Sequence, residues 1–139
     1  PNIFKNDKTL LLNFVRGVFD TDLCFCLSKQ SRKDEIKSYP QICFVSKSES
    51  FTNEISNALK DLGLDFKGKV YKVVDIDIRA KAGCTVTYRF DMYGHKYFIQ
   101  VLKIIGLRHP KHLKKYEFWW NINKENPRIL KLRYSGDRI

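Results

Sequence analysis

The chain has 139 residues, 43% of them hydrophobic, which is enough for one globular domain with a sizeable core. Its 26 lysines and arginines against 15 acidic residues give a net charge of +11, so nucleic acid is the first candidate partner, ahead of an anionic membrane or no polyanion at all. The sequence has neither an apolar run of about 18 residues nor a visible secretory signal, so we expect no membrane span.

Residues 10–23, LLLNFVRGVFDTDL, predict an unusually apolar helix. Apolar side chains on nearly every side are typical of a helix that is buried on more than one face. Asp7 or Thr9 could cap its first turn, because each offers a side-chain oxygen to the free backbone N–H groups.

Two features of this helix point beyond a role in the core. Asn13, Gly17 and Thr21 lie four residues apart on one side, and such small residues would let a second backbone approach closely. Asp20 and Asp22 lie at the C-terminal end, where the helix dipole disfavours negative charge unless a cation is near. The alternative is a core helix that ends in a solvated turn.

A hairpin is predicted next. Residues 24–30 alternate weakly between apolar and polar and predict a strand, which a charged turn over 31–37 follows. Residues 39–47, YPQICFVSK, predict the partner strand, and Pro40 suits a strand end or an edge because proline cannot donate to a ladder.

The second helix begins at Ser48, which has capping chemistry together with Glu49 and Ser50. One helical face is apolar and carries Phe51, Ile55, Ala58, Leu59 and Leu62. Gly63 follows at the position of a left-handed C-cap. We expect this helix to cover one face of a sheet.

Residues 69–79 and 85–92 predict two alternating strands joined by a turn over 80–83. The apolar face carries Val70, Val74, Ile76 and Ile78 on the first strand and Val86, Tyr88, Phe90 and Met92 on the second. The opposite face is polar, as in strands with one solvated side. Its residue types can read base edges in a major groove, although a plain solvated face is an equal alternative.

Two further helices are predicted after a break at Tyr93-Gly94. The first carries Tyr97, Phe98, Val101, Leu102 and Ile105 and ends at Gly106. The second begins near Pro110, which suits a first helical turn, and should be packed down by Leu113, Tyr116 and the aromatic residues 118–120. Basic residues crowd its start, where backbone N–H groups favour anions. Residues 121–139 predict a basic C-terminal extension, either ordered or contacting DNA, after a domain of residues 1–120.

The sequence gives no sign of a metal site built from cysteine or histidine. The cysteines are Cys24, Cys26, Cys43 and Cys84. They contain no C-x-x-C pair, so we expect reduced, half-buried strand residues in an intracellular protein, in cytoplasm, nucleoid or organelle matrix. His109 and His112 have no third ligand in view, and we expect them to be solvated or to contact phosphate.

The element order is helix, hairpin, helix, hairpin, helix, helix, which predicts an α+β layer fold. Val15 to Leu23, VRGVFDTDL, resembles the LAGLIDADG motif of homing endonucleases. YPQICFVSKS, the helix that ends in LGL, and the segment HPKHLKKYEFW agree with the single-motif members of that family over roughly residues 9–120. The resemblance implies an αββαββα fold whose antiparallel sheet forms a saddle over DNA, with helices on one face.

The resemblance also implies a function. Single-motif members are homodimeric, sequence-specific DNA endonucleases, often associated with introns or inteins, whose motif helices pack together. Here Asn13, Gly17 and Thr21 would form that dimer interface, and Asp22 would bind Mg²⁺ or another divalent cation at the scissile phosphate. Asp20 matches the first motif acid, a helix-end residue. Lys111 and, less closely, Lys47 match basic residues near the catalytic site, although each could merely position a phosphate.

The residues expected to contact double-stranded DNA are Ser28, Gln30, Arg32, Gln41, Lys69, Tyr71, Asp75, Asp77, Arg79, Thr85, Thr87 and Arg89. One departure from the motif concerns its final glycine, which is Leu23 here. Because glycine gives conformational freedom after the helix, Leu23 could reshape the approach of Asp22 to DNA. The alternative function is therefore a non-catalytic DNA- or RNA-binding protein on the same fold, such as a splicing cofactor or a repurposed regulator.

Overall fold

The structure, a computed structural model, describes residues 6–29 and 37–134. Within these ranges the fold is α+β, with a four-stranded antiparallel sheet and five helices. The elements are α1 (Lys8–Asp22), β1 (Leu23–Lys29), β2 (Lys37–Ser46), α2 (Glu49–Asp61), β3 (Tyr71–Ile76), β4 (Cys84–Tyr93), α3 (His95–Ile104), α4 (Pro110–Asn123) and α5 (Pro127–Tyr134). None of the helices in the described part is both long and apolar enough to cross a membrane.

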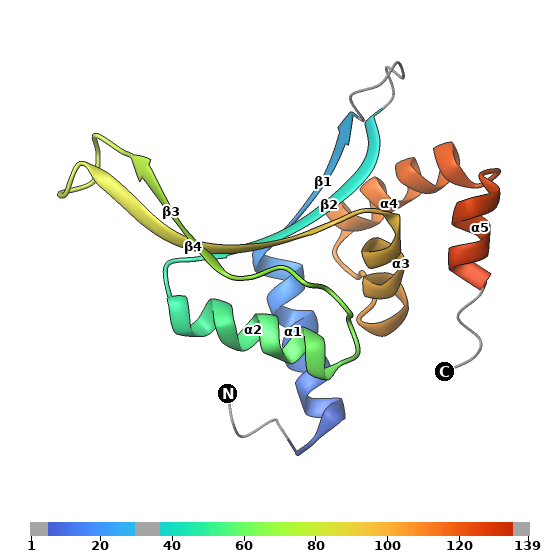
Figure 1. The fold of residues 1–139 in the computed structure, drawn as a ribbon, viewed down its shortest axis with the longest axis horizontal. Coiled ribbons are helices and arrows are strands. Elements are labelled where there is room, and N and C mark those ends of the chain that lie inside the picture. The colour runs from blue at the N-terminus through green and yellow to red at the C-terminus, as the bar shows by residue number, and fades with distance from the viewer. Residues whose placement is uncertain (1–5, 30–36, 135–139) are drawn as a thin grey trace.

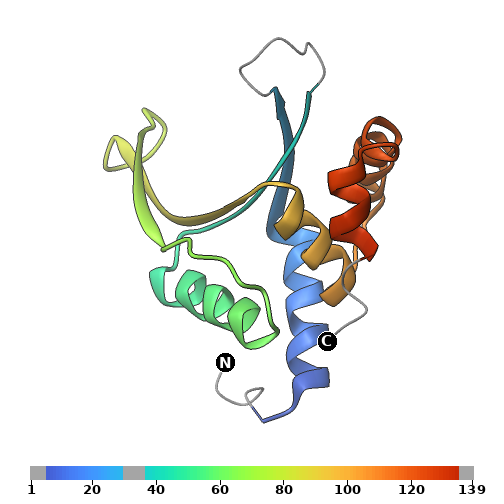
Figure 2. The ribbon, with the colours of Figure 1, turned by 45° about the vertical axis from the view of Figure 1, so that its right-hand side comes forward.

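The sheet has the strand order β1-β2-β4-β3, so two hairpins are joined through the central pair β2 and β4. It curves strongly, and the two hairpins rise on opposite sides of a hollow (Figure 1; Figure 2). Helices α1 and α2 lie under the convex side. We call the other side, which carries Gln41 and Arg89, the concave face.

The core lies between the convex side of the sheet and the helices. Phe25 stacks on Phe98 of α3 with ring centroids 4.3 Å apart, and Phe98 meets Trp119 of α4 edge-on at 4.8 Å. Phe44 and Phe90 stack at 5.6 Å over α2. These aromatic contacts connect three helices to strands β1, β2 and β4, so the sheet and its helices form one core.

Helix boundaries follow the predicted capping chemistry. Asp7 accepts hydrogen bonds from the N–H groups of Thr9 and Leu10, at 2.9 and 3.0 Å, as expected for α1. Ser48 caps α2, and Gly63 takes φ +100° just after that helix ends. Pro40 lies within β2, paired with Leu27 of β1 but ahead of the ladder with β4, which begins at Gln41, so it occupies a local edge of the sheet, where a missing N–H breaks no ladder with β4.

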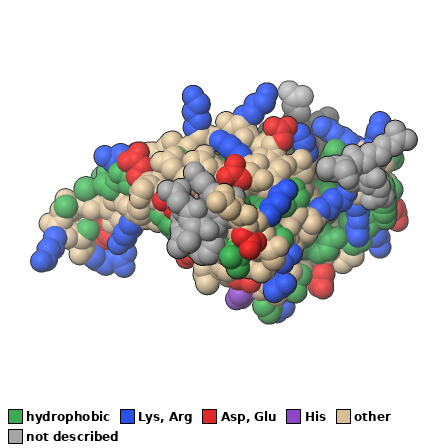
Figure 3. Space-filling view, turned by 90° about the horizontal axis from the view of Figure 1, so that it is seen from below, with side chains coloured by type: hydrophobic (Ala, Val, Ile, Leu, Met, Phe, Trp, Pro, Cys, Tyr) green, Lys and Arg blue, Asp and Glu red, His purple; other side chains and the backbone are tan. Residues whose placement is uncertain are grey.

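The predicted apolar face of the second hairpin exists, but the expectation that it is buried is wrong for β3 and the turn after it. Val74, Ile76 and Ile78 are 57%, 89% and 93% exposed. They share the convex side with buried Phe90, because Val74 pairs with Val86, but the hairpin extends past the helices (Figure 1). From the helix side, hydrophobic side chains lie along this projecting arm (Figure 3). The alternating pattern therefore predicted correctly which residues share a face, but helices do not cover that face along the whole hairpin.

The C-terminal region also differs from expectation. α4 runs through residue 120, where the sequence suggested a domain end, and Ile129 of α5 is buried in the common core. Leu113 and Phe118 are 38% and 50% exposed, so they do not pack α4 down as predicted. Trp119 and Tyr116 of the predicted set do so, and the Trp119 indole N–H donates to His95 Nδ1 at 3.0 Å.

Candidate nucleic-acid interface

The end of α1 presents Asp22 to solvent beside the sheet. Leu11, Val15, Val18 and Phe19 anchor one side of α1 in the core, and Leu23 is buried as β1 begins. The Thr21 hydroxyl lies 3.1 Å from Asp22 Oδ2, while Asp22 itself is exposed. A buried residue on either side of the exposed turn thus fixes where the carboxylate emerges.

Leu23 takes an ordinary extended backbone conformation, with φ −74° and ψ 133°. Any residue can adopt these angles, so this position does not require glycine. The Leu23 side chain instead lies on the convex side, since Leu23 pairs with Phe44 and both are buried. The structure therefore accommodates leucine here without backbone strain.

The predicted stripe on α1 is open. Asn13, Gly17 and Thr21 are all exposed, and a Cβ built on Gly17 would meet nothing within 4 Å. Within the described part of one chain, α1 is therefore buried on one side, whereas its composition predicted burial on more than one. Leu10 at the start of the helix is 49% exposed as well.

The start of α4 lies against the end of α1. His112 is buried, and its Nε2 is 3.2 Å from the carbonyl oxygen of Phe19 in the last turn of α1. His109 accepts a hydrogen bond from the Lys111 N–H at 3.2 Å and so caps α4. The expectation of a solvated or phosphate-binding His112 is wrong, because this ring joins two helices. Lys111 is exposed near the turn that carries Asp22.

The tautomer of His112 follows from these contacts. Only a protonated Nε2 can donate to the Phe19 carbonyl, which leaves Nδ1 as the buried atom without a hydrogen-bond partner. Burial first, and then the neighbouring Lys111, lower the pKa of His112. Both effects favour the neutral ring at neutral pH.

Lys47 is exposed and lies just beyond the last residue of β2. β2 reaches the end of α1 through Phe44, which pairs with Leu23 next to Asp22. Lys111 belongs to α4, whose His112 contacts Phe19 in the last turn of α1. The two lysines thus belong to two different segments that each adjoin the end of α1.

Strand register brings most of the expected DNA-contacting residues to the concave face. Directly paired residues of antiparallel strands share a face, and the pairs Tyr71–Arg89, Val45–Arg89 and Gln41–Cys26 connect all four strands. The members of the set that these pairs place on this face are Ser28, Gln41, Tyr71, Asp75, Thr85, Thr87 and Arg89. Lys69 precedes β3, and Gln30 and Arg32 lie outside the described residues.

An ionic network occupies the middle of this face. Arg89 donates to Asp91 through Nη2 at 2.7 Å and through Nε at 2.9 Å, while Gln41 and Tyr71 also donate to Asp91. Burial opposes ionisation of Asp91, but these hydrogen bonds outweigh it and lower its pKa. Burial and the contact with Asp91 raise the pKa of Tyr71 to about 12. Arg89 is therefore held in place rather than free in solvent.

The turn of the second hairpin holds another pair. Asp77 accepts from the Arg79 backbone N–H at 3.0 Å and from its guanidinium at 3.1 Å, and these bonds lower the Asp77 pKa. The Arg79 side chain nevertheless remains 88% exposed. Because its guanidinium is already in solvent, Arg79 can contact a phosphate without any rearrangement of the turn.

Sequence reasoning missed a group of thiols on the concave face. Cys24 pairs directly with Cys43, and the sulfurs of Cys24 and Cys26 are 3.4 Å apart. All three are free thiols, and burial raises the pKa of Cys43 to about 12. Their i, i+2 spacing and their place in the predicted hairpin could have indicated this cluster. The described residues contain no group of three or more His, Cys, Asp or Glu that could hold a metal ion.

Neither a family model nor any curated protein matches this sequence.

Proposed function

We propose that the chain is a homodimeric, sequence-specific DNA endonuclease of the LAGLIDADG type, with DNA on the concave face and Asp22 at the reacting phosphate. The observation that carries the proposal is the construction of α1. One side is anchored in the core, the other leaves Gly17 with nothing within 4 Å of an added Cβ, and the helix ends in exposed Asp22. A second α1 packed on that open side would bring two Asp22 carboxylates together.

The character of the concave face supports DNA as the partner. The chain carries a net charge of +11, which favours binding to a polyanion. Thr85, Thr87 and Gln41 offer hydroxyl and amide groups of the kind that read base edges. Arg79 at the tip of one hairpin would contact phosphate and fix the register of the duplex.

The donor chemistry at Asp22 fits a hard divalent cation. Mg²⁺ prefers oxygen ligands and is commonly held by one or two carboxylates together with substrate phosphate and water. One exposed Asp22 per chain, with a second from the partner, meets that requirement. The bound ion would make a water molecule more acidic and would neutralise charge on the phosphate.

The remaining roles belong to this chain's own side chains. Lys111 and Lys47, both exposed and both on segments that adjoin the end of α1, would orient water and stabilise negative charge that develops on the phosphate oxygens. Asp20 would remain a helix-end residue. His112 would act through Lys111, by holding the first turn of α4 against the last turn of α1.

A non-catalytic binder on the same fold would use the same concave face and charge but would not need Asp22. Cleavage of a randomised duplex library with Mg²⁺, by the native chain and by Asp22→Asn, separates the two functions. We expect Asp22→Asn to lower cleavage more than about 100-fold, because a direct ligand matters more than the groups that support it. Removal of Mg²⁺ should also stop cleavage.

Asp61→Asn is the matched control, since Asp61 is exposed at the end of α2 and the charge change is the same. It should cut as the native chain does. If neither the native chain nor the variants cut but all retain the same sequences, the binding function is the correct one. Loss of binding together with cleavage in Asp22→Asn would make Asp22 a structural residue.

A further inference from the structure

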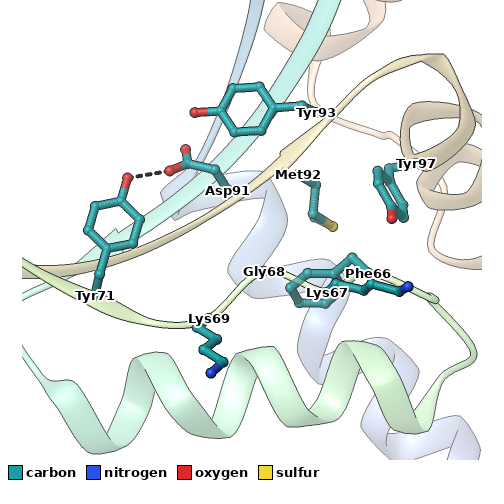
Figure 4. Close-up of a pocket in the computed structure, with 9 residues that line it drawn as sticks. All are labelled: Phe66, Lys67, Gly68, Lys69, Tyr71, Asp91, Met92, Tyr93 and Tyr97. Atoms are coloured by element: carbon teal, nitrogen blue, oxygen red, sulfur yellow. Dashed lines mark hydrogen bonds between the residues drawn. The ribbon is translucent and has the colours of Figure 1, made fainter.

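A cavity of about 420 Å³ lies beside the concave face, at the end of β4 (Figure 4). The ladder between β3 and β4 begins with Tyr71 opposite Arg89, so the last residues of β4 have no strand partner on that side. The segment of residues 66–69 runs past this edge instead. The cavity is thus formed where β4 has no hydrogen-bonded partner strand and a loop segment lies beside it instead.

Gly68 holds this segment close to β4. A Cβ at Gly68 would lie 2.8 Å from the Asp91 carbonyl oxygen, which is too close for any side chain. Phe66, two residues earlier, stacks on Phe90 of β4 with centroids 5.6 Å apart. These two contacts fix the wall of the cavity from inside the core, so its shape does not depend on flexible side chains alone.

Three tyrosine rings line the cavity, whereas Phe66 is 4% exposed, with Phe90 stacked on its ring and the Lys60 ammonium 5.2 Å from its centroid. In Figure 4, Tyr71 and Tyr93 lie on one side of Met92, and Phe66 and Tyr97 lie on the other. Lys67 and Lys69 are exposed at the rim. Tyr71 and Tyr93 also belong to the concave face, because they pair with Arg89 and Gln41. The cavity therefore continues the concave face.

The single acid in the lining is already neutralised. Asp91 accepts from Arg89, Gln41 and Tyr71, so its carboxylate is not free for a cationic ligand. This argues against a cage for a quaternary ammonium group, which the aromatic lining would otherwise suggest. Aromatic rings beside lysines match instead a flat base attached to a phosphate.

We propose that this cavity binds one unpaired nucleotide of DNA held on the concave face, with its base against the tyrosine rings and its phosphate beside Lys67. The inference rests on the proposed DNA-binding function and goes beyond it, since cleavage of a duplex does not require an extruded base. The volume is within the range of small-ligand sites. Extrusion is least unfavourable where a base is already unpaired.

The test compares a fully paired duplex with the same duplex carrying one unpaired 2-aminopurine, by titration with the native chain. We expect the second duplex to bind about ten-fold more tightly, because each base stacked on an aromatic ring strengthens binding by about that factor or more. Its emission should fall as the base stacks. Tyr97→Leu, which removes the flat ring but keeps apolar bulk, should abolish the preference and leave paired-duplex affinity unchanged.

Lys67→Ala should weaken binding of the unpaired duplex several-fold, whereas Lys124→Ala, the same charge change at the exposed end of α4, should not. Equal affinity of the native chain for both duplexes overturns the inference alone, as does a preference that survives in both Tyr97→Leu and Lys67→Ala. Absence of binding to either duplex overturns the proposed function and the inference with it.

Discussion

His112 makes the junction between α1 and α4 depend on a single neutral ring. Its Nε2–H donates to the Phe19 carbonyl, and its other nitrogen is buried without a partner. A second proton would place a charge and an unsatisfied donor in that site, which is unfavourable. The position of Lys111, one residue before, follows from this contact.

This predicts an acid-side loss of stability. Burial and Lys111 lower the folded-state pKa of His112 below its ordinary value of 6.5, so the unfolded chain binds more protons between these two values. The free energy of unfolding should therefore fall as pH drops below about 6.5 and level off beneath the folded-state pKa. Urea unfolding between neutral and mildly acid pH measures it.

His112→Gln should make this acid-side loss shallower, because glutamine can still donate to Phe19 but does not titrate. Asn121→Gln, at an exposed and non-titrating position of the same helix, is the control and should leave the slope unchanged. Some slope will remain in both, since burial and Arg128 also lower the pKa of His95. Identical slopes for His112→Gln and the native chain would assign the whole effect to other groups.

Leu23 provides a second prediction for a single residue. It is 3% exposed in the core beside Phe44, so Leu23→Ala should lower the free energy of unfolding by about 2–5 kcal/mol. Leu10→Ala, on α1 and 49% exposed, should lower it by less than about 1 kcal/mol. Chemical denaturation of both variants tests whether this departure from the motif is a core residue.

At the scale of the element, α1 combines a core-facing side with an open one. Gly17→Leu should convert a dimer to a monomer, as measured by sedimentation equilibrium, because two helix backbones could no longer approach. The isolated chain should lose no stability, since the added side chain begins in open space and leucine is a better helix former than glycine by about 0.8 kcal/mol. Asn57→Leu, at an exposed position of α2, is the control and should leave the dimer intact. An unchanged dimer would contradict the α1 interface.

Periodicity predicted the elements well where the chain itself determines them. Both hairpins, the α2 cap at Ser48 and the helix start at Pro110 follow from neighbouring residues alone. Neighbouring residues do not determine what covers a strand face. Ile76 lies on the predicted apolar face of β3, yet it is 89% exposed because β3 extends past α2. Alternation specifies on which side of the sheet a residue lies, but not how far along the strand a helix covers that side.

The candidate site divides in the same way. The concave-face residues could be predicted because strands place alternate side chains on one face. The contact of His112 with Phe19 could not, since it joins residues 93 apart in sequence. The cavity at Gly68 could not be predicted from the sequence either, because it arises where a loop segment lies beside β4 in place of a strand.

At the scale of the whole molecule, the positive charge predicts a strong dependence of DNA binding on salt. The logarithm of the association constant should fall linearly with the logarithm of salt concentration, by about 0.9 per phosphate contact. Arg79→Ala should reduce that slope by about one contact, because its guanidinium is exposed at the tip of a hairpin. Arg128→Ala, exposed on α5, should not. Equal slopes would remove Arg79 from the interface.

The uncovered hairpin has a consequence for how this protein behaves at high concentration. β3 is an edge strand, and its exposed Val74 and Ile76 adjoin unpaired backbone groups, which is a template for pairing with another copy. Lys72 lies on the same side, since it pairs with Tyr88, and its charge opposes that association. Salt screens such repulsion beyond about 10 Å at 0.1 M. Under the proposed function, the ionic strength that weakens DNA binding would therefore also promote aggregation through this edge.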